Sequence, residues 1–276
     1  MIKILEHGGG KLVVRYEPRL REHLLEAKGL CNDYFFLALQ GSQNYNLNYE
    51  NSDIDTKMLT LPSFEEFALS KQPLSNTHIM PNNEHVDMKD IRVMFGCFWK
   101  QNINFLEILF SKYNIVNPEY KDEFNALYAL REDIAHYNNY AAVNCMAGMA
   151  REKYKALKHP YPATAEKIAK YGYDGKQLHH IMRMDEFMTG YLKGLPFEEC
   201  LTSYPKYGRD NLLLAKKNGF CLEYAEELSA KIIHRIDGLK DGYMSTHPVV
   251  VNNQVRKEAE EIMIEILKKN FRKQIA

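Results

Sequence analysis

Two aspartates separated by one residue, Asp53 and Asp55, have the spacing in this chain that most directly indicates chemistry. Side chains alternate along a β-strand, so residues at i and i+2 point from the same face. Two carboxylates on one face repel each other unless a cation lies between them. Mg²⁺ suits such oxygen ligands, and when few carboxylates bind it, it keeps positions for water and phosphate. The pair therefore predicts a metal–nucleotide site.

A glycine and a serine precede the two acids. The apolar segment 34–40 has the composition of a buried strand and ends in Gly41-Ser42. Glycine lets the backbone approach a ligand closely, and the serine hydroxyl can bond to a phosphate oxygen. Lys57 alternates to the same face as the two acids, where it would either neutralise them or contact phosphate. The sequence leaves both options for Lys57 open.

A third acid would strengthen the metal prediction, because three carboxylates can hold two ions roughly 4 Å apart during phosphoryl transfer. The best candidate is Asp87, with Val86 and Met88 as the opposite face of a short strand. Asp90 falls where a helix begins, which is typical of a cap or a first-turn charge. Glu84 lies in a predicted turn. The sequence does not decide between these three acids, although it favours Asp87.

The order Gly-Ser, Asp-x-Asp and a later strand aspartate resembles the DNA polymerase β nucleotidyltransferase superfamily. Within it, the chain is similar to the predicted nucleotidyltransferases of bacteria and phages that are associated with RNA-repair pathways. The resemblance extends over about residues 34–193 and departs at Asn46, where glycine is expected, although asparagine also tolerates the left-handed region. The segments that carry it are 41–47 with 52–55, 86–92, 102–109 and 172–183.

The resemblance implies a role for each motif. Gly41-Ser42 would start a helix whose backbone amides meet a triphosphate, which agrees with the affinity of helix N-termini for phosphate. Asp53 and Asp55 would bind Mg²⁺ (or Mn²⁺). Asp87 would complete the metal site and deprotonate or orient the attacking hydroxyl.

Three residues at i, i+4 and i+7 on a predicted helix, Lys176, His180 and Arg183, share one face. By themselves they favour a solvated basic face, paired with Asp174 or Asp185, with His180 as a core histidine. With the resemblance they are predicted to bind nucleotide, Arg183 through two parallel hydrogen bonds to phosphate and Lys176 as a point charge.

The patterns along the chain predict an α+β fold, in which a small mixed nucleotidyltransferase sheet with flanking helices precedes an all-helical C-terminal half. Residues 1–115 are expected to form the catalytic domain, and residues 116–276 a helical domain that closes the nucleotide cleft. Ser63, followed by Glu65 and Glu66, predicts the N-cap of a short helix. Strands are predicted at 12–16 after a Gly8-Gly-Gly10 turn, and at 34–40, 53–59, 75–80 and 84–88. Other helices are predicted at 18–28, 89–100, 103–113, 119–157 (as one helix or two), 163–170, 174–193, 221–238 and 254–272.

Composition limits the classes of protein. The 276 residues include 36 basic and 36 acidic ones, so no global field attracts the chain to nucleic acid or to anionic lipid. Five dispersed cysteines without a CxxC pair predict reduced thiols in the cytoplasm rather than a zinc site. No apolar run approaches the roughly 18 residues of a membrane span, and the N-terminus lacks a secretory pattern.

The expected activity is metal-dependent transfer of a nucleoside monophosphate from an NTP to an acceptor hydroxyl, with release of pyrophosphate. An RNA or tRNA end is one candidate acceptor, and zero net charge weakens it slightly. One alternative is nucleotidylation of a small molecule or of a protein side chain. Another is a non-catalytic module that binds a nucleotide or a partner. The sequence decides neither the acceptor nor the base of the NTP nor the oligomeric state.

Overall fold

The computed structural model describes residues 10–49 and 52–275. The chain has the predicted α+β class, and it folds as two compact units. Unit 1 comprises Met1–Tyr137 together with Asn252–Ala276, and unit 2 comprises Asn138–Val251. In the described part of the chain, no helix combines the length and the apolar composition needed to cross a bilayer.

A five-stranded mixed sheet forms the centre of unit 1, with the strand order β3-β4-β2-β1-β5. The central strand β2 runs antiparallel to β1 and parallel to β4. The strands are β1 (Asp33–Gln40), β2 (Asp55–Leu61), β3 (Ser75–Ile79), β4 (His85–Asp90) and β5 (Asn114–Val116). In β4, half-buried and buried residues alternate, so its two faces have different surroundings.

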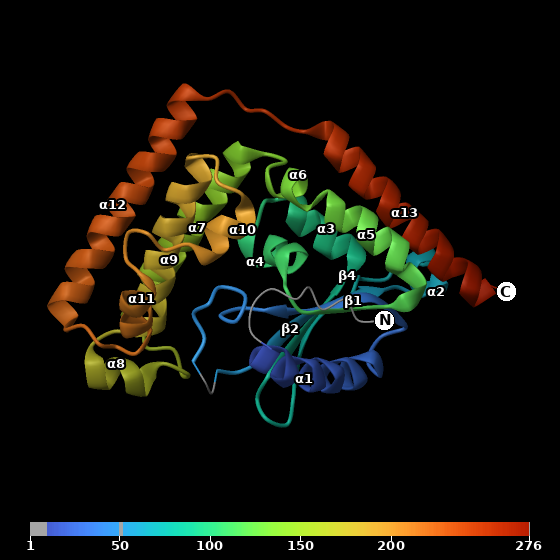
Figure 1. Cartoon of the computed structure of the whole chain (residues 1–276), viewed down its shortest axis with the longest axis horizontal. Helices are drawn as coiled ribbons and strands as arrows, with labels where there is room; N and C mark the ends of the chain where they lie inside the picture. Colours follow the sequence, from blue (N-terminus) through green and yellow to red (C-terminus); the bar gives the residue numbers. More distant parts are fainter. Residues whose placement is uncertain (1–9, 50–51, 276) are drawn as a thin grey trace. The chain divides into compact units, whose positions relative to one another are not determined.

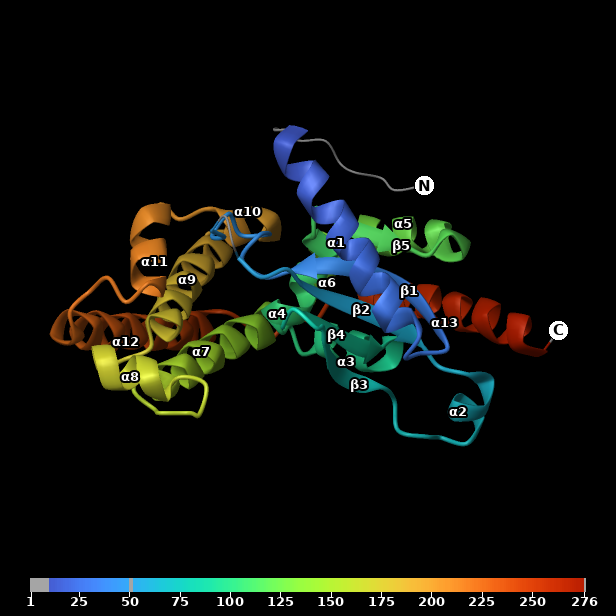
Figure 2. The same cartoon turned by 90° about the horizontal axis from the view of Figure 1, so that it is seen from below.

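Helices cover both faces of this sheet. Helix α1 (Gly10–Lys28) lies on one face, while α3 (Ile91–Trp99), α4 (Ile103–Leu106) and α5 (Lys121–Ala129) lie on the other (Figure 1 and Figure 2). Tyr16 and Leu20 of α1 belong to the same buried cluster as Met58, Val86 and Met88 of the sheet. The remaining elements of unit 1 are α2 (Phe64–Ala68), η1 (Glu107–Phe110), η2 (Pro118–Tyr120), α6 (Arg131–Ala135) and α13 (Asn253–Ile275).

The sequence predicted a strand at 12–16, and this was wrong, because α1 begins at Gly10 and continues through this segment. Tyr16, Leu20 and Ala27 are buried at spacings of four and seven residues, so they form the helical stripe that packs on the sheet. Most of the predicted Gly8-Gly-Gly10 turn lies outside the described residues. Ser63 does cap α2, in a reciprocal arrangement with Glu66.

Unit 2 consists of helices around the buried helix α9 (Gly175–Leu192). Asp185 of α9 is fully buried and accepts hydrogen bonds from Lys206 Nζ and the Tyr207 hydroxyl, both at 2.5 Å, and it also pairs with Arg235. One carboxylate thus ties α9 to the loop that carries Lys206 and Tyr207 and to the helix that carries Arg235. The other helices are α7 (Asn139–Ala156), α8 (Ala165–Tyr171), α10 (Phe197–Thr202), α11 (Arg209–Lys216) and α12 (Leu222–Thr246).

The division between the units differs from the predicted division at 115/116. Helices α5 and α6 belong to unit 1, and the terminal helix α13 returns to it. Asn270 of α13 donates to the Pro62 carbonyl at 2.8 Å, and Lys269 pairs with Glu123 of α5 at 2.9 Å. The sequence predicted a helix at 254–272 but not the surface that it covers.

Candidate functional site

The Gly-Ser turn and the first two acids lie next to each other, where β1 ends and β2 begins in the sheet of unit 1. The pairing of β1 with β2 places Gln40 opposite Asp55, so the end of β1 and the start of β2 lie side by side. Gly41 has a φ of 86°, a conformation that favours glycine. Asn46 has a φ of 57°, so asparagine does adopt the left-handed conformation expected of the family's glycine.

The expected helix after Gly41-Ser42 is not present, because residues 42–46 form a closed turn. The Asn44 amide donates to the Gly41 carbonyl at 3.0 Å, and the Leu47 amide donates to the Ser42 carbonyl at 2.9 Å. The left-handed Asn46 stops a helix from propagating. A phosphate at this turn would therefore meet a few backbone amides rather than the dipole of a long helix.

Hydrogen bonds hold the segment that carries the two acids. Gln43 of the turn donates its side-chain amide to the Asp53 carbonyl. The Ile54 amide donates to Glu84 Oε1 at 3.0 Å. Glu84 Oε2 in turn contacts Arg19 and, at 3.0 Å, His23 Nε2, both on α1. Glu84 therefore acts as a support of the acid segment, a role that the sequence did not reveal.

The charge of Glu84 is stabilised by these contacts. Burial by itself would raise the pKa of this carboxyl group, but hydrogen bonds from Asn82, His23, Arg19 and the Ile54 amide outweigh burial and hold the pKa at about 2. An ionised carboxylate so fully occupied by donors has little capacity left for a metal ion. Asp90 is also occupied, because it caps α3 and pairs with Arg92 through two bonds of 2.8 and 2.7 Å.

Asp53 and Asp55 do not share a strand face as predicted, because β2 begins at Asp55 and Asp53 precedes it. Asp53 is exposed, and the Asp55 side chain is 37% exposed. Asp55 Oδ1 accepts the His85 amide at 3.0 Å and lies 3.4 Å from His85 Nδ1. Both acids therefore keep carboxylate oxygens open to solvent, at the start of β2.

Asp87 lies on the same face of the sheet as Asp55 and Lys57, since Lys57 and Asp87 are opposite each other in the β2–β4 register. Lys57 Nζ donates to Asp87 Oδ2 at 2.6 Å, and Lys89 Nζ lies 3.0 Å from Oδ1. Burial opposes the charge on Asp87, but the two lysines outweigh it and lower its pKa. Lys57 was expected either to neutralise the acids or to contact phosphate. In this structure it neutralises an acid, which is Asp87.

The environment of Lys57 is unusual for a lysine. Its side chain is 4% exposed, and its ammonium group lies over the Phe105 ring, 4.3 Å from the centroid. Burial lowers the pKa of Lys57, while Asp87 acts in the opposite direction. The sequence could have indicated the second cation, since Lys89 alternates to the same face as Asp87.

Whether the acids fit a metal ion can be tested on these contacts. Among the described residues, no three His, Cys, Asp or Glu side chains are arranged to hold an ion. Asp53 and Asp55 fit one hard cation that completes its shell with water. Asp87 holds two ammonium groups, so a site with three acids and two ions does not fit this arrangement.

The three predicted nucleotide-binding residues of unit 2 lie on α9, as the spacing indicated. Lys176 is exposed in the first turn, next to the N-cap Asp174, whereas Arg183 is only 5% exposed. The pKa of His180 lies well below its usual value. Burial is the largest cause, and the nearby Arg183, His179, Lys176 and Lys153 lower the pKa further. His180 is therefore a neutral imidazole at neutral pH and not a third cation.

Replacing Glu84 with glutamine tests the support of the acid segment. At pH 7 we expect the variant to lose about 2 kcal/mol of unfolding free energy, because charged hydrogen bonds to Arg19 and Ile54 become neutral ones. The folded pKa of Glu84 is depressed, so its stabilisation is present above its ordinary pKa of 4.5 and is lost as the pH falls towards about 2. Urea unfolding of both proteins from pH 7 to pH 2 should show the gap closing.

The matched control for this experiment is Glu65→Gln, since Glu65 is exposed on α2. It should leave the unfolding free energy and its pH dependence close to those of the wild type. A Glu84→Gln protein with the stability of the wild type at pH 7 would show that Glu84 does not support the segment.

No protein-family model matches the chain, and a search of curated proteins found none similar to it. The family resemblance therefore stays a prediction from the motifs, and the function has to be argued from the residues of the site.

Proposed function

We propose that the protein is a nucleotidyltransferase, dependent on Mg²⁺ or Mn²⁺, that transfers a nucleoside monophosphate from an NTP to an acceptor hydroxyl. The proposal rests on one observation: the Gly41-Ser42 turn lies next to Asp53 and Asp55, where β1 ends and β2 begins. Backbone amides at a tight turn bind phosphate oxygens, and exposed carboxylates bind the cation that accompanies a triphosphate. A site that binds a metal–triphosphate complex requires both of these features.

In the proposed reaction, the acceptor oxygen bonds to the α-phosphorus while the bond from this phosphorus to the bridging oxygen breaks. Pyrophosphate leaves, and the acceptor proton passes to a base or to water. When bound, the metal ion neutralises charge on the phosphates. Catalysis then depends mainly on positioning, as in other phosphoryl transfers. Asp53 and Asp55 would hold the ion, and the backbone amides of Ser42 and Gln43 would receive the phosphates, because the amides of residues 44–47 donate within the turn.

Asp87 suits orientation of the acceptor hydroxyl better than removal of its proton. A general base is most effective when its pKa lies near the working pH. The two lysines hold the pKa of Asp87 below its usual value, so it is a weak base in this arrangement. Its carboxylate can still accept a hydrogen bond from the acceptor if one lysine moves aside.

The lysines also support a second candidate, a module that binds a nucleotide or a partner without catalysis. In such a module the third acid is not needed for metal, and Lys57 would neutralise it permanently. The buried position of Lys57 over Phe105 is the observation that favours this candidate. For Lys176, His180 and Arg183, a role in nucleotide binding stays a prediction from the resemblance.

The activity is tested by incubating the chain with each NTP labelled in the α-phosphate, Mg²⁺ or Mn²⁺, and either RNA or no acceptor. Label on RNA would identify a nucleic-acid acceptor, and label on the protein would identify a side-chain acceptor. In Asp53→Asn/Asp55→Asn we expect turnover to fall by about 100-fold or more, because the ion loses both its charged ligands.

Asp122→Asn is the control, since Asp122 is an exposed acid on α5 of the same unit. It should turn over like the wild type. If the double variant matches the wild type in turnover and in metal-dependent NTP binding, the catalytic proposal fails. If the wild type binds NTP but no acceptor is labelled, the non-catalytic module is the better account.

Lys57→Met tests whether Asp87 can contribute to metal binding. Methionine keeps the apolar contact with Phe105 but removes the ammonium group from Asp87. In the enzyme, Asp87 becomes available to the ion, so Mn²⁺ binding measured by calorimetry with an NTP analogue should become several-fold tighter. Lys112→Met, at an exposed lysine, should leave it unchanged. Unchanged Mn²⁺ affinity in a folded Lys57→Met protein would show that Asp87 takes no part in metal binding.

A further inference from the structure

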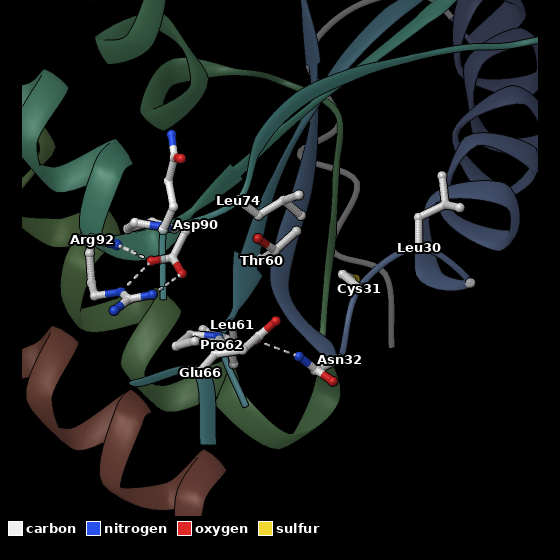
Figure 3. Close-up of a pocket in the computed structure, with 13 residues that line it drawn as sticks. Leu30, Cys31, Asn32, Thr60, Leu61, Pro62, Glu66, Leu74, Asp90 and Arg92 are labelled. Carbon is white, nitrogen blue, oxygen red and sulfur yellow. Dashed lines mark hydrogen bonds and ion pairs between the residues drawn. The ribbon is translucent and has the colours of Figure 1, made fainter. Parts of the chain in front are cut away.

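A separate cavity lies at the carboxyl ends of β2 and β4, which run parallel in the sheet of unit 1 (Figure 3). It measures about 390 Å³, within the range of pockets that hold small molecules. The acids of the candidate functional site lie at the opposite ends of these strands. A strand of seven residues is about 20 Å long, so the two places are separate.

The cavity and the acids also lie on opposite faces of the sheet. Thr60 and Asp90 each lie two residues after Met58 and Met88, so they point to the same face of the sheet, which α1 covers. Lys57 and Asp87 point to the other face. The residues that line the cavity come from the loop after α1, from β2 and α2, from the segment before β3, and from the junction of β4 with α3. They are Gly29, Leu30, Cys31, Asn32, Thr60, Leu61, Pro62, Glu66, Gln72, Pro73, Leu74, Asp90 and Arg92.

Thr60 is the residue that points to a ligand. It is 2% exposed, and within the described part of the chain its hydroxyl has no hydrogen-bond partner. Figure 3 shows its side chain among the lining residues, with Leu30 and Cys31 to one side and Asp90 and Arg92 to the other. The hydroxyl oxygen is not fully enclosed by protein, so it is open to the cavity and can form a hydrogen bond with a ligand there.

The charges around the cavity limit what can bind there. Arg92 is neutralised by Asp90, to which it forms two hydrogen bonds. Glu66 adds a further negative charge, held by the Ser63 amide and the Asn32 side chain, each at 2.8 Å. The lining therefore carries an excess of one negative charge, which disfavours a phosphate or a carboxylate.

The walls add a second limit. Leu61, Pro62 and Leu74 offer apolar surface, and Leu30 leaves 51% of its surface exposed beside the cavity. Burial raises the pKa of the Cys31 thiol to about 11, so it stays protonated and acts as a further apolar surface. The cavity thus combines apolar walls with hydrogen-bonding groups on Thr60 and Asn32.

We propose that this cavity binds an uncharged heterocycle with hydrogen-bond donors and acceptors along its edge, as in the base of a nucleoside without phosphate. The body of the ring contacts the leucine and proline side chains. Its edge bonds to the Thr60 hydroxyl and to the side-chain oxygen of Asn32, whose nitrogen donates to Glu66. This site does not depend on the proposed function, because it shares no residue with the turn or with the acids.

The test is a titration of the full chain with adenosine, inosine, cytidine and uridine, followed by calorimetry and by amide NMR shifts. At least one nucleoside should bind and shift the amides of residues 29–32 and 74. Thr60→Val should weaken this binding about fivefold through loss of one hydrogen bond, while Thr60→Ser should retain it. Thr77→Val, at an exposed threonine on β3, is the matched control.

Three outcomes would overturn the proposal. The first is that no nucleoside binds at millimolar concentration. The second is that the shifts fall at residues 41–55, which would place the nucleoside at the candidate functional site. The third is that Thr60→Val, folded as judged by its amide spectrum, binds like the wild type. Each result is independent of whether the chain transfers nucleotides.

Discussion

The register of β2 between β1 and β4 determines the arrangement of unit 1. Side chains alternate along this strand, so Met58 joins the core beneath α1 while Lys57 faces Asp87 on the opposite surface. A slip of one residue would exchange the two sets and bury the charges in the apolar core. The same register places Asp55 opposite Gln40, and therefore beside the Gly41-Ser42 turn. Both the candidate functional site and the separate cavity follow from this pairing.

The acids of unit 1 differ in what already occupies them, and this difference assigns their roles. Glu84 is occupied by donors from α1 and from the Ile54 amide, so it supports the segment that carries Asp53 and Asp55. Asp87 is occupied by two lysines, and a role in catalysis requires at least one of them to move. Asp53 and Asp55 keep solvent-facing oxygens. The proposed function therefore rests on two acids, with the third available only after a rearrangement of charge.

Much of the secondary structure could be predicted from local sequence, because the alternation of side chains along a strand and the capping of a helix are local properties. The strand at 34–40, the cap at Ser63 and the helix that carries Lys176 and Arg183 are of this kind. The strand at 12–16 was wrong because the helical stripe through Tyr16 becomes visible only when the sheet it packs on is known. The Lys57–Asp87 pair depends on a parallel register between distant strands, which no local pattern specifies. Helices α10 and α11 are short and were not predicted.

In the proposed function, Asp53 and Asp55 hold a divalent ion next to a bound triphosphate. Electron paramagnetic resonance of Mn²⁺, titrated into the chain with a non-hydrolysable NTP, measures this binding. We expect a bound ion in the wild type, with affinity that increases when the nucleotide is present, and loss of this ion in Asp53→Asn/Asp55→Asn. Equal Mn²⁺ binding by the wild type and the double variant would contradict the proposal.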